Sequence, residues 1–303
     1  MSHKIRHIET DIEVQNVGGI RQLCPAYSLQ LVDGSRVSLT PGMGMQCTWE
    51  GPRLCTGCEA PMTDPRREYC YECFVGLASN DLCFVAPHRC HHHLGTCRDS
   101  GWAETVCMQP HTVYLSISSG PKVGITRKGR EHRRWVGQGA VDALPIAAAP
   151  SRRAAGCLER SLSAWLADST AWRSLVSGRI KRVDLMSVWR QLRHKLPIPG
   201  EVAGEALTDA ERAELVWMSE AEARAQQVSV EYPVESFAPA RVLGPDPDQR
   251  QVVGRLTGII GSYLLFEHGV VAFSALSGQA VICDIGDHYR QVADRDSPQQ
   301  SLF

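Results

Sequence analysis

The residues in this chain best suited to chemistry are two pairs of cysteines. Cys55 and Cys58 form one Cys-x2-Cys pair, Cys70 and Cys73 form another, and eleven residues separate the two pairs. Each pair fits one turn of backbone, so both of its thiolates can point at one ion, and a tight hairpin can bring the pairs together. This spacing favours four thiolates around a tetrahedral Zn²⁺. Because a four-thiolate site has no open coordination position, we expect a structural zinc.

A second group of zinc ligands is predicted directly after the first. Its members are Cys83, Cys90, Cys97 and Cys107, at irregular spacing. The run His91-His92-His93 lies among them, and one of these histidines is an alternative ligand, because thiolate and neutral imidazole both bind zinc well. The competing interpretation is a set of buried thiols beside solvent-facing histidines.

A basic central segment carries residues that could grip phosphate. Between His111 and Arg160 there are nine Lys or Arg residues against three Asp or Glu, although the net charge of the chain is only −1. Arginine forks match phosphate oxygens, and an indole ring can stack on a base. The candidate nucleic-acid contacts are Lys122, Lys128, Arg130, Arg133 and Trp135. Composition alone favours the competing interpretation, which is a solvated basic loop.

The elements around this segment follow from residue patterns. Thr112–Ile117 reads as a strand, Ser118-Ser-Gly-Pro as a turn, and 122–126 as the returning strand. Apolar residues at helical spacing predict a helix over about 152–167, and Glu159 lies within their stripe. A carboxylate on a mostly apolar face needs a partner or a metal ion.

The remaining patterns indicate an α+β protein in several parts. A hairpin with its turn at Asp33-Gly34 is expected near the N-terminus, and a capping box at Thr208 predicts a helix running to about Gln227. The predicted order is an N-terminal β segment (1–46), a zinc-ribbon-like module (47–110), a small α/β core with extra helices (111–200), an acidic helix (201–230), a small C-terminal β domain (231–292) and a tail (293–303).

Composition excludes some classes of protein. The chain has 303 residues, 43% apolar and 21% charged, which is an ordinary globular balance. The N-terminus has no apolar stretch typical of a signal peptide, and the longest apolar run, near 258–273, is interrupted by Glu267 and His268. We therefore expect a cytoplasmic protein without membrane contact, whose twelve cysteines stay reduced and available to metal.

Several strings of residues resemble a bacterial family known as domain of unknown function twenty-seven ninety-seven. The strings are VYL, KVGITR, RW, QGA and AG..E, preceded by the cysteine block, with GRLTGIIGSYLLF nearer the C-terminus. The resemblance runs from about Cys47 to Asp284. The family name implies no activity.

The strings VYL and KVGIT also show a weaker resemblance to the GIY-YIG nuclease fold. The resemblance implies that Tyr114 belongs to the first motif, that Arg127 or Arg134 is the catalytic arginine, and that Glu159 is the metal-binding carboxylate. It also implies one divalent ion, expected to be Mg²⁺, at Glu159. The second motif lacks its tyrosine, so a fold without the chemistry remains an alternative.

The expected function is a zinc-containing protein that binds DNA or RNA, with metal-dependent phosphodiester cleavage as the expected enzyme activity. One rival is a zinc-stabilised nucleic-acid-binding protein that cuts nothing. A second rival is a protein-interaction adaptor that uses the acidic helix as its contact surface.

Overall fold

The computed structural model describes residues 2–64, 67–166, 169–202, 207–244, 250–276 and 278–290. The predicted tail, 293–303, lies outside these residues. The strands are β1 (Ser2–Val17), β2 (Ile20–Leu31), β3 (Arg36–Leu39), β4 (Gly44–Glu50), β5 (His111–Ile117), β6 (Pro121–Arg127), β7 (Asp142–Ala149), β8 (Val216–Trp217), β9 (Val228–Val230), β10 (Gln251–Ile260), β11 (Tyr263–Phe266), β12 (Gly269–Ala272) and β13 (Ala280–Ile285).

The helices are α1 (Tyr71–Gly76), α2 (Leu82–Val85), α3 (Ser100–Val106), α4 (Glu131–Gly137), α5 (Arg152–Leu162), α6 (Trp172–Val176), α7 (Leu185–Lys195), α8 (Pro199–Val202), α9 (Asp209–Glu214) and α10 (Glu220–Gln226). Short 3-10 turns are η1 (Ala78–Asn80), η2 (Pro87–Arg89), η3 (His92–Leu94), η4 (Phe273–Leu276) and η5 (Asp287–Arg290). The expected mixed α+β class is confirmed.

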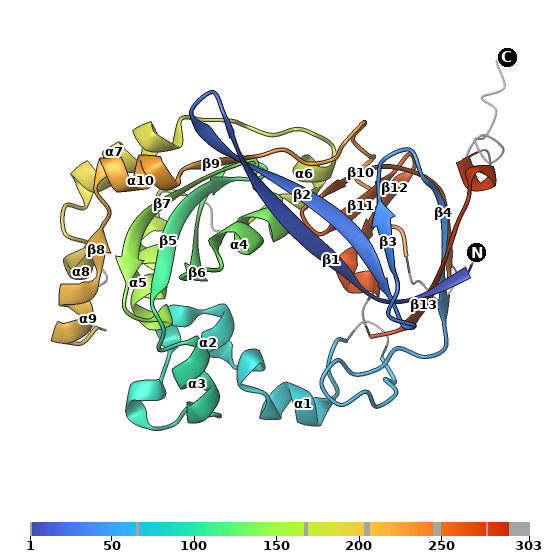
Figure 1. Cartoon of the computed structure of the whole chain (residues 1–303). Helices are drawn as coiled ribbons and strands as arrows, with labels where there is room; N and C mark the ends of the chain where they lie inside the picture. The colour runs from blue at the N-terminus through green and yellow to red at the C-terminus, as the bar shows by residue number, and fades with distance from the viewer. Residues whose placement is uncertain are drawn as a thin grey trace, which may run out of the picture.

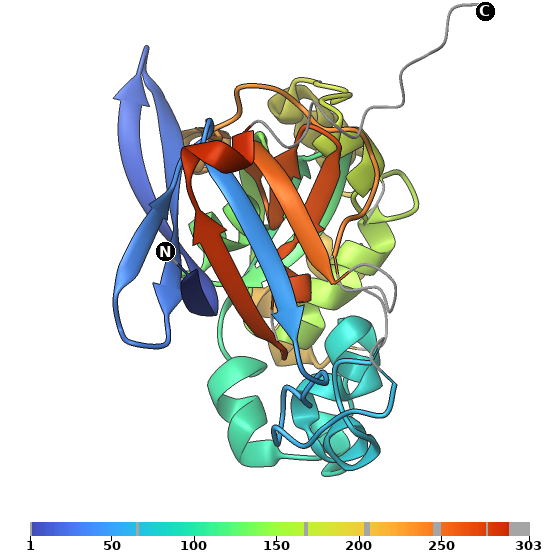
Figure 2. The same cartoon turned by 90° about the vertical axis from the view of Figure 1, so that its right-hand side faces the viewer.

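The strands from both ends of the chain belong to one sheet. Within the described residues the path is β12-β11-β10-β4-β13-β1-β2-β9-β7-β5-β6, with β3 paired to β2 and β8 paired to β7. β13 lies between β4 and β1, antiparallel to both (Figure 2). The N-terminal β segment and the C-terminal β domain, separate in the sequence-based division, therefore contribute strands to one sheet and share a buried core that includes Tyr27, Trp49 and Phe266.

The long β1–β2 hairpin connects this β region to the strands around the central segment (Figure 1). β2 pairs in parallel with β9, and β9 pairs with β7. β5 lies between β7 and β6, antiparallel to both, and β6 is the last strand of the path. β6 is thus one of the two end strands of this path, and within the described residues its outer edge pairs with no other strand.

Both faces of the β5 strand are covered. Val113, Leu115 and Ile117 pack in the core that contains α5 and α7, whereas Tyr114 packs with Trp135 of α4 in a different cluster. All seven residues of β5 are buried, as expected for a strand with helices on each side. This arrangement puts α4 and α5 on opposite sides of the same three strands.

The local predictions are mostly present, with one correction. The hairpin at Asp33-Gly34 joins β2 to β3, with Gly34 at φ 85°. The single helix predicted from Thr208 to about Gln227 is wrong: the structure has α9, then β8, then α10. The break occurs because Val216 and Trp217 pair with β7 and because Ser219 opens a second capping box.

Candidate functional site

The four predicted thiolates of the first zinc site lie together. The Sγ atoms of Cys55, Cys58, Cys70 and Cys73 are all within 4.8 Å of one another. The Sγ atoms of Cys58 and Cys70 are 3.7 Å apart, close to the edge of a tetrahedron of zinc-bound sulfurs, which is about 3.8 Å for Zn–S bonds of about 2.3 Å. The four sulfurs are therefore close enough together to bind one Zn²⁺ ion.

Backbone N–H groups favour the thiolate form of Cys55, which is the form that binds metal. The Cys70 and Gly57 amides donate to the Cys55 sulfur at 3.2 and 3.4 Å. The hydrogen bond from Cys70 is the largest influence that lowers the pKa of Cys55. Gly57 has to lack a side chain, because a Cβ there would lie 2.9 Å from the Cys73 sulfur. The residues between the cysteines are thus fitted to the cluster.

The cysteine-rich region has little apolar core to hold it together. Between residues 51 and 110 the buried residues described are Cys55, Pro87, Ala103 and Cys107. Such a small buried surface contributes too little free energy to order some sixty residues. A structural metal supplies the missing stabilisation in modules of this kind.

The second predicted zinc set is not assembled in the way we expected. Within the described residues, the sulfurs of Cys83, Cys90, Cys97 and Cys107 do not together form a group whose atoms all lie within 4.8 Å of one another. Cys83 instead forms such a group with Asp81 and His91. Spacing alone missed Asp81, which is also the N-cap of α2 and accepts a hydrogen bond from the Cys83 amide at 3.2 Å.

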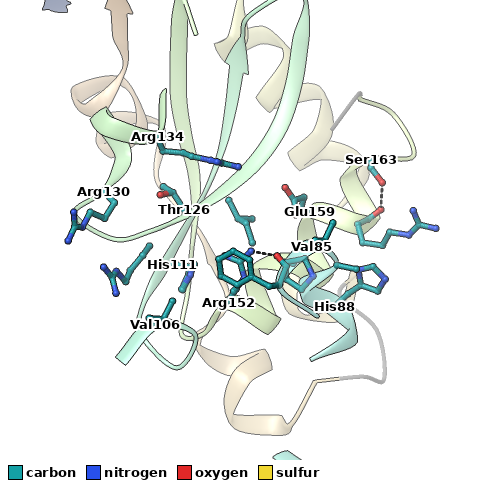
Figure 3. A pocket seen from close by; sticks show the side chains of 17 residues that line it. Val85, His88, Val106, His111, Thr126, Arg130, Arg134, Arg152, Glu159 and Ser163 are labelled. Atoms are coloured by element: carbon teal, nitrogen blue, oxygen red, sulfur yellow. Dashed lines mark hydrogen bonds between the residues drawn. The ribbon is translucent and has the colours of Figure 1, made fainter. Parts of the chain in front are cut away.

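A pocket of about 930 Å³ opens at the outer edge of β6, between α4, α5 and the cysteine-rich region (Figure 3). We call it the arginine pocket, because five arginines line it. Its charged and titratable lining residues are Arg127, Arg130, Arg134, Arg152, Arg160, His88, His111 and Glu159. The cysteine-rich region contributes the segment Phe84–His88 and Val106 to the walls.

The cysteine-rich region reaches this pocket through a close contact. η2 packs on α5, where a Cβ added to Gly156 would lie 2.4 Å from the Cβ of Pro87. Phe84 accepts a hydrogen bond from Arg152 Nη2 at 2.6 Å through its carbonyl oxygen, and the Arg152 guanidinium lies 4.3 Å from the Phe84 ring centroid. The cysteine-rich region therefore forms one wall of the pocket.

Three of the predicted catalytic residues meet at the arginine pocket. Arg127 ends β6, Arg134 is on α4 and Glu159 is on α5. Arg134 and Glu159 point into the cavity from opposite sides (Figure 3). The sequence left the choice between Arg127 and Arg134 open, and both line the same cavity.

Tyr114 is placed behind the pocket and not in its lining. Its side chain is fully buried, and its ring leaves no room for a Cβ on Gly124, which would lie 2.7 Å from the phenolic oxygen. With the Gln138 amide oriented to satisfy both neighbours, its nitrogen donates to Tyr114 Oη at 2.9 Å and its oxygen accepts from Arg134 Nε and Nη2 at 2.8 Å. Burial is the main cause that raises the pKa of Tyr114.

The predicted nucleic-acid contacts separate in space. Arg130 lines the arginine pocket, and Lys128 is exposed next to it in sequence. Arg133 faces a different hollow, beside His7 and Thr10 of β1. The Lys122 Nζ is buried and donates to Thr170 Oγ1 at 2.6 Å. Trp135 is 1% exposed in the core, so its indole has no surface on which a base could stack.

Two residues that line the pocket were missed by sequence reasoning. Burial lowers the pKa of Arg152, and the electrostatic interactions with Cys107 and Glu159 oppose that effect. Burial also lowers the pKa of His111 to about 4. The Nδ1 of His111 lies 2.7 Å from the Gln109 carbonyl, which can only accept, so Nδ1 carries the proton and Nε2 keeps its lone pair. His111 is the first residue of β5, and nothing in the residues next to it predicts that its ring lines a pocket.

Among the described residues, no helix is long and apolar enough to cross a membrane. Comparison with curated proteins and with solved structures yields no match. The nuclease-fold resemblance therefore stays a prediction. A family model matches residues 42–281, which include both cysteine pairs and the whole arginine pocket. Because that match covers most of the chain, this protein belongs to the family described as Protein of unknown function (DUF2797).

Proposed function

We propose that this protein binds nucleic acid at the arginine pocket and hydrolyses a phosphodiester bond there with a divalent metal ion at Glu159. The observation that supports the proposal is the composition of the pocket walls, in which five arginines surround one carboxylate. Phosphate carries concentrated negative charge and accepts bidentate hydrogen bonds from arginine forks. The near-neutral net charge of −1 makes this local concentration of arginine stand out.

The arginines are held in place before a ligand arrives. Arg134 is fixed by Gln138, Arg127 donates to the Thr105 carbonyl at 2.9 Å, and Arg152 is held by Phe84. Preorganised donors lose little side-chain entropy on binding and can stabilise charge that develops on a phosphate during reaction. We assign Tyr114 as a positioning residue, since it reaches Arg134 through Gln138.

The pocket offers one carboxylate, a ligand type that Mg²⁺ prefers. Mg²⁺ in phosphoryl-transfer sites is often held by one or two carboxylates together with substrate phosphates and waters. Glu159 supplies one carboxylate to a cavity large enough for those waters, and the substrate would supply the remaining oxygens. When bound, the ion would polarise the scissile phosphate.

His111 is our candidate for moving a proton. Its Nε2 lone pair, in a ring that lines the pocket, can accept a proton from an attacking water. Tyr114 is less suited to that step, because it does not line the cavity. Arg134, on the opposite wall from Glu159, would stabilise negative charge on the phosphate.

Purified full-length protein would be tested with labelled single- and double-stranded DNA and RNA, with and without Mg²⁺. We expect Glu159→Gln to abolish cleavage and to retain binding, because the arginines hold the strand. Arg134→Ala should weaken binding about tenfold to hundredfold, the loss of one charge-assisted contact of about 1.5–3 kcal/mol. Arg133→Ala on the same helix is the matched control, since its side chain faces another hollow.

Each result has a defined meaning. Binding that responds equally to Arg133→Ala and Arg134→Ala would remove the arginine pocket from the proposal. Cleavage that survives Glu159→Gln would exclude Glu159 as the metal ligand. Pocket-dependent binding without any cleavage by the wild-type protein would establish the rival, a nucleic-acid-binding protein that does not cut.

A further inference from the structure

A second set of metal-ligating atoms lies in the cysteine-rich region, apart from the first zinc cluster. One carboxylate oxygen of Asp81, the Sγ of Cys83 and a ring nitrogen of His91 are within 4.8 Å of one another. They come from three short segments, which are the cap of α2, α2 itself and the residue before η3. The set combines oxygen, sulfur and nitrogen donors, all of which bind zinc.

Neighbouring side chains hold two of these ligands from behind. Arg98 Nε donates to Asp81 Oδ2 at 2.7 Å, which leaves Oδ1 facing His91. The Nδ1 of His91 lies 2.8 Å from Thr96 Oγ1. Metal-binding histidines and carboxylates commonly have such partners, which fix their orientation.

Thr96 holds one nitrogen of the His91 ring and leaves the other facing Asp81. The Thr96 hydroxyl that contacts Nδ1 also lies 3.3 Å from the His91 carbonyl oxygen, and the two contacts fix the orientation of the ring. His91 Nε2 then faces Asp81 Oδ1 at 3.5 Å. When Nδ1 carries the proton, the Nε2 lone pair and the carboxylate oxygen can both bind one cation.

The separation of those two atoms suits a metal ion better than a hydrogen bond. A distance of 3.5 Å is beyond the usual range for a good N–H···O hydrogen bond. Two ligands of a tetrahedral zinc with bonds of about 2.0–2.1 Å lie about 3.4 Å apart. The position between His91 and Asp81 thus has the width of one edge of a zinc coordination sphere.

We propose that Asp81, Cys83 and His91 bind a second Zn²⁺, with a water in the fourth position. This site replaces the four-cysteine set that spacing suggested. Its structural effect is local: Cys83 precedes Phe84, whose carbonyl and ring hold Arg152. A metal at Cys83 therefore fastens α2 as a wall of the arginine pocket, whatever ligand that pocket takes.

The first test uses the wild-type protein. Metal analysis of purified full-length protein should give two zinc ions per chain. Zinc X-ray absorption should show nitrogen or oxygen neighbours in addition to sulfur, because the first cluster offers sulfur alone. One zinc per chain with an all-sulfur shell would overturn the proposal and would leave His91 and Asp81 as a simple ion pair.

The second test uses variants. His91→Ala should lose one zinc and keep the other, whereas His92→Ala is the matched control, because His92 Nε2 pairs with Glu104 at 3.2 Å and is outside the ligand group. Cobalt substitution of His91→Ala should retain the thiolate-to-cobalt absorption of the first cluster, which also shows that the variant is folded there. An unchanged zinc content in His91→Ala would contradict the site.

Discussion

At the scale of single residues, the candidate sites depend on a few positions where close neighbours restrict the side chain or shift its pKa. Gly57 and Gly124 are needed because a Cβ would collide with Cys73 or Tyr114. His111 has a buried ring with one nitrogen engaged by a carbonyl, so it stays neutral at a pH where exposed histidines begin to charge. These effects come from neighbours that are distant in sequence.

His111 should make the stability of the protein depend on pH. Burial lowers its pKa from 6.5 to about 4 in the folded protein. Because the unfolded chain binds the proton more tightly, this stabilisation is complete above pH 6.5 and is lost as the pH falls toward about 4. The free energy of unfolding should fall by up to about 3 kcal/mol over that window.

Urea denaturation at a series of pH values would measure this effect. His111→Gln should reduce the slope of the curve between pH 4 and pH 6.5, whereas His194→Gln, at an exposed position of α7, should leave it unchanged. The same slope in His111→Gln and in the wild-type protein would assign the titration to another group.

At the scale of elements, the contact of α5 with η2 is the joint between the cysteine-rich region and the rest of the protein. Gly156 permits that contact, because its absent Cβ leaves room for Pro87 and for the His88 amide. The same helix presents Arg152 and Glu159 to the arginine pocket. The position of the wall and the position of the charged side chains are therefore coupled.

Gly156→Ala should destabilise the protein although alanine is the better helix former. The added Cβ would lie 2.4 Å from Pro87 Cβ and 3.0 Å from the His88 backbone nitrogen, and relief requires a backbone shift. We expect a loss of about 1–3 kcal/mol by chemical denaturation. Gly137→Ala, the control on α4, meets nothing within 4 Å and should be neutral or stabilising by up to about 1 kcal/mol. Equal effects of the two substitutions would exclude a steric joint at Gly156.

At the scale of the whole molecule, two parts of the protein depend on different sources of stability, which are apolar packing and metal binding. The sheet regions have extensive apolar cores, which contain Trp49, Trp189 and Phe266 among many others. The cysteine-rich region has very few buried apolar residues among those described. It contacts both sheet regions: the Leu54 amide donates to the Gly278 carbonyl before β13, and Pro87 packs on α5. We therefore expect metal binding to stabilise the cysteine-rich region and to have little effect on the stability of the sheet.

Removing zinc with a chelator should unfold the cysteine-rich region while the sheet persists. We expect hydrogen exchange to lose protection within 51–110 and to remain slow in β5, β7 and β10, because their hydrogen bonds are buried in apolar cores. Addition of Zn²⁺ should restore protection. Global unfolding on chelation, or no change anywhere, would refute this division of stability.

The sequence by itself determined the features that depend on residues close together in the chain. Two Cys-x2-Cys pairs predict the first zinc cluster, because each pair needs only one turn to aim its sulfurs. Two strand-like segments around the turn Ser118-Ser-Gly-Pro predict the β5–β6 hairpin, and the apolar stripe predicts α5 with Glu159 on it. The family was also recognisable from such strings, since motifs are local.

Only the tertiary structure decided which side of each element a residue faces and what lies against it. It buried Trp135 and Lys122, turned Arg133 away from Arg134, brought Asp81 to Cys83 and His91, and made Arg152 and His111 part of the pocket. It also paired strands from the two ends of the chain in one sheet. The physical reason is that burial and pairing depend on the summed packing of segments far apart in sequence, which no local spacing encodes.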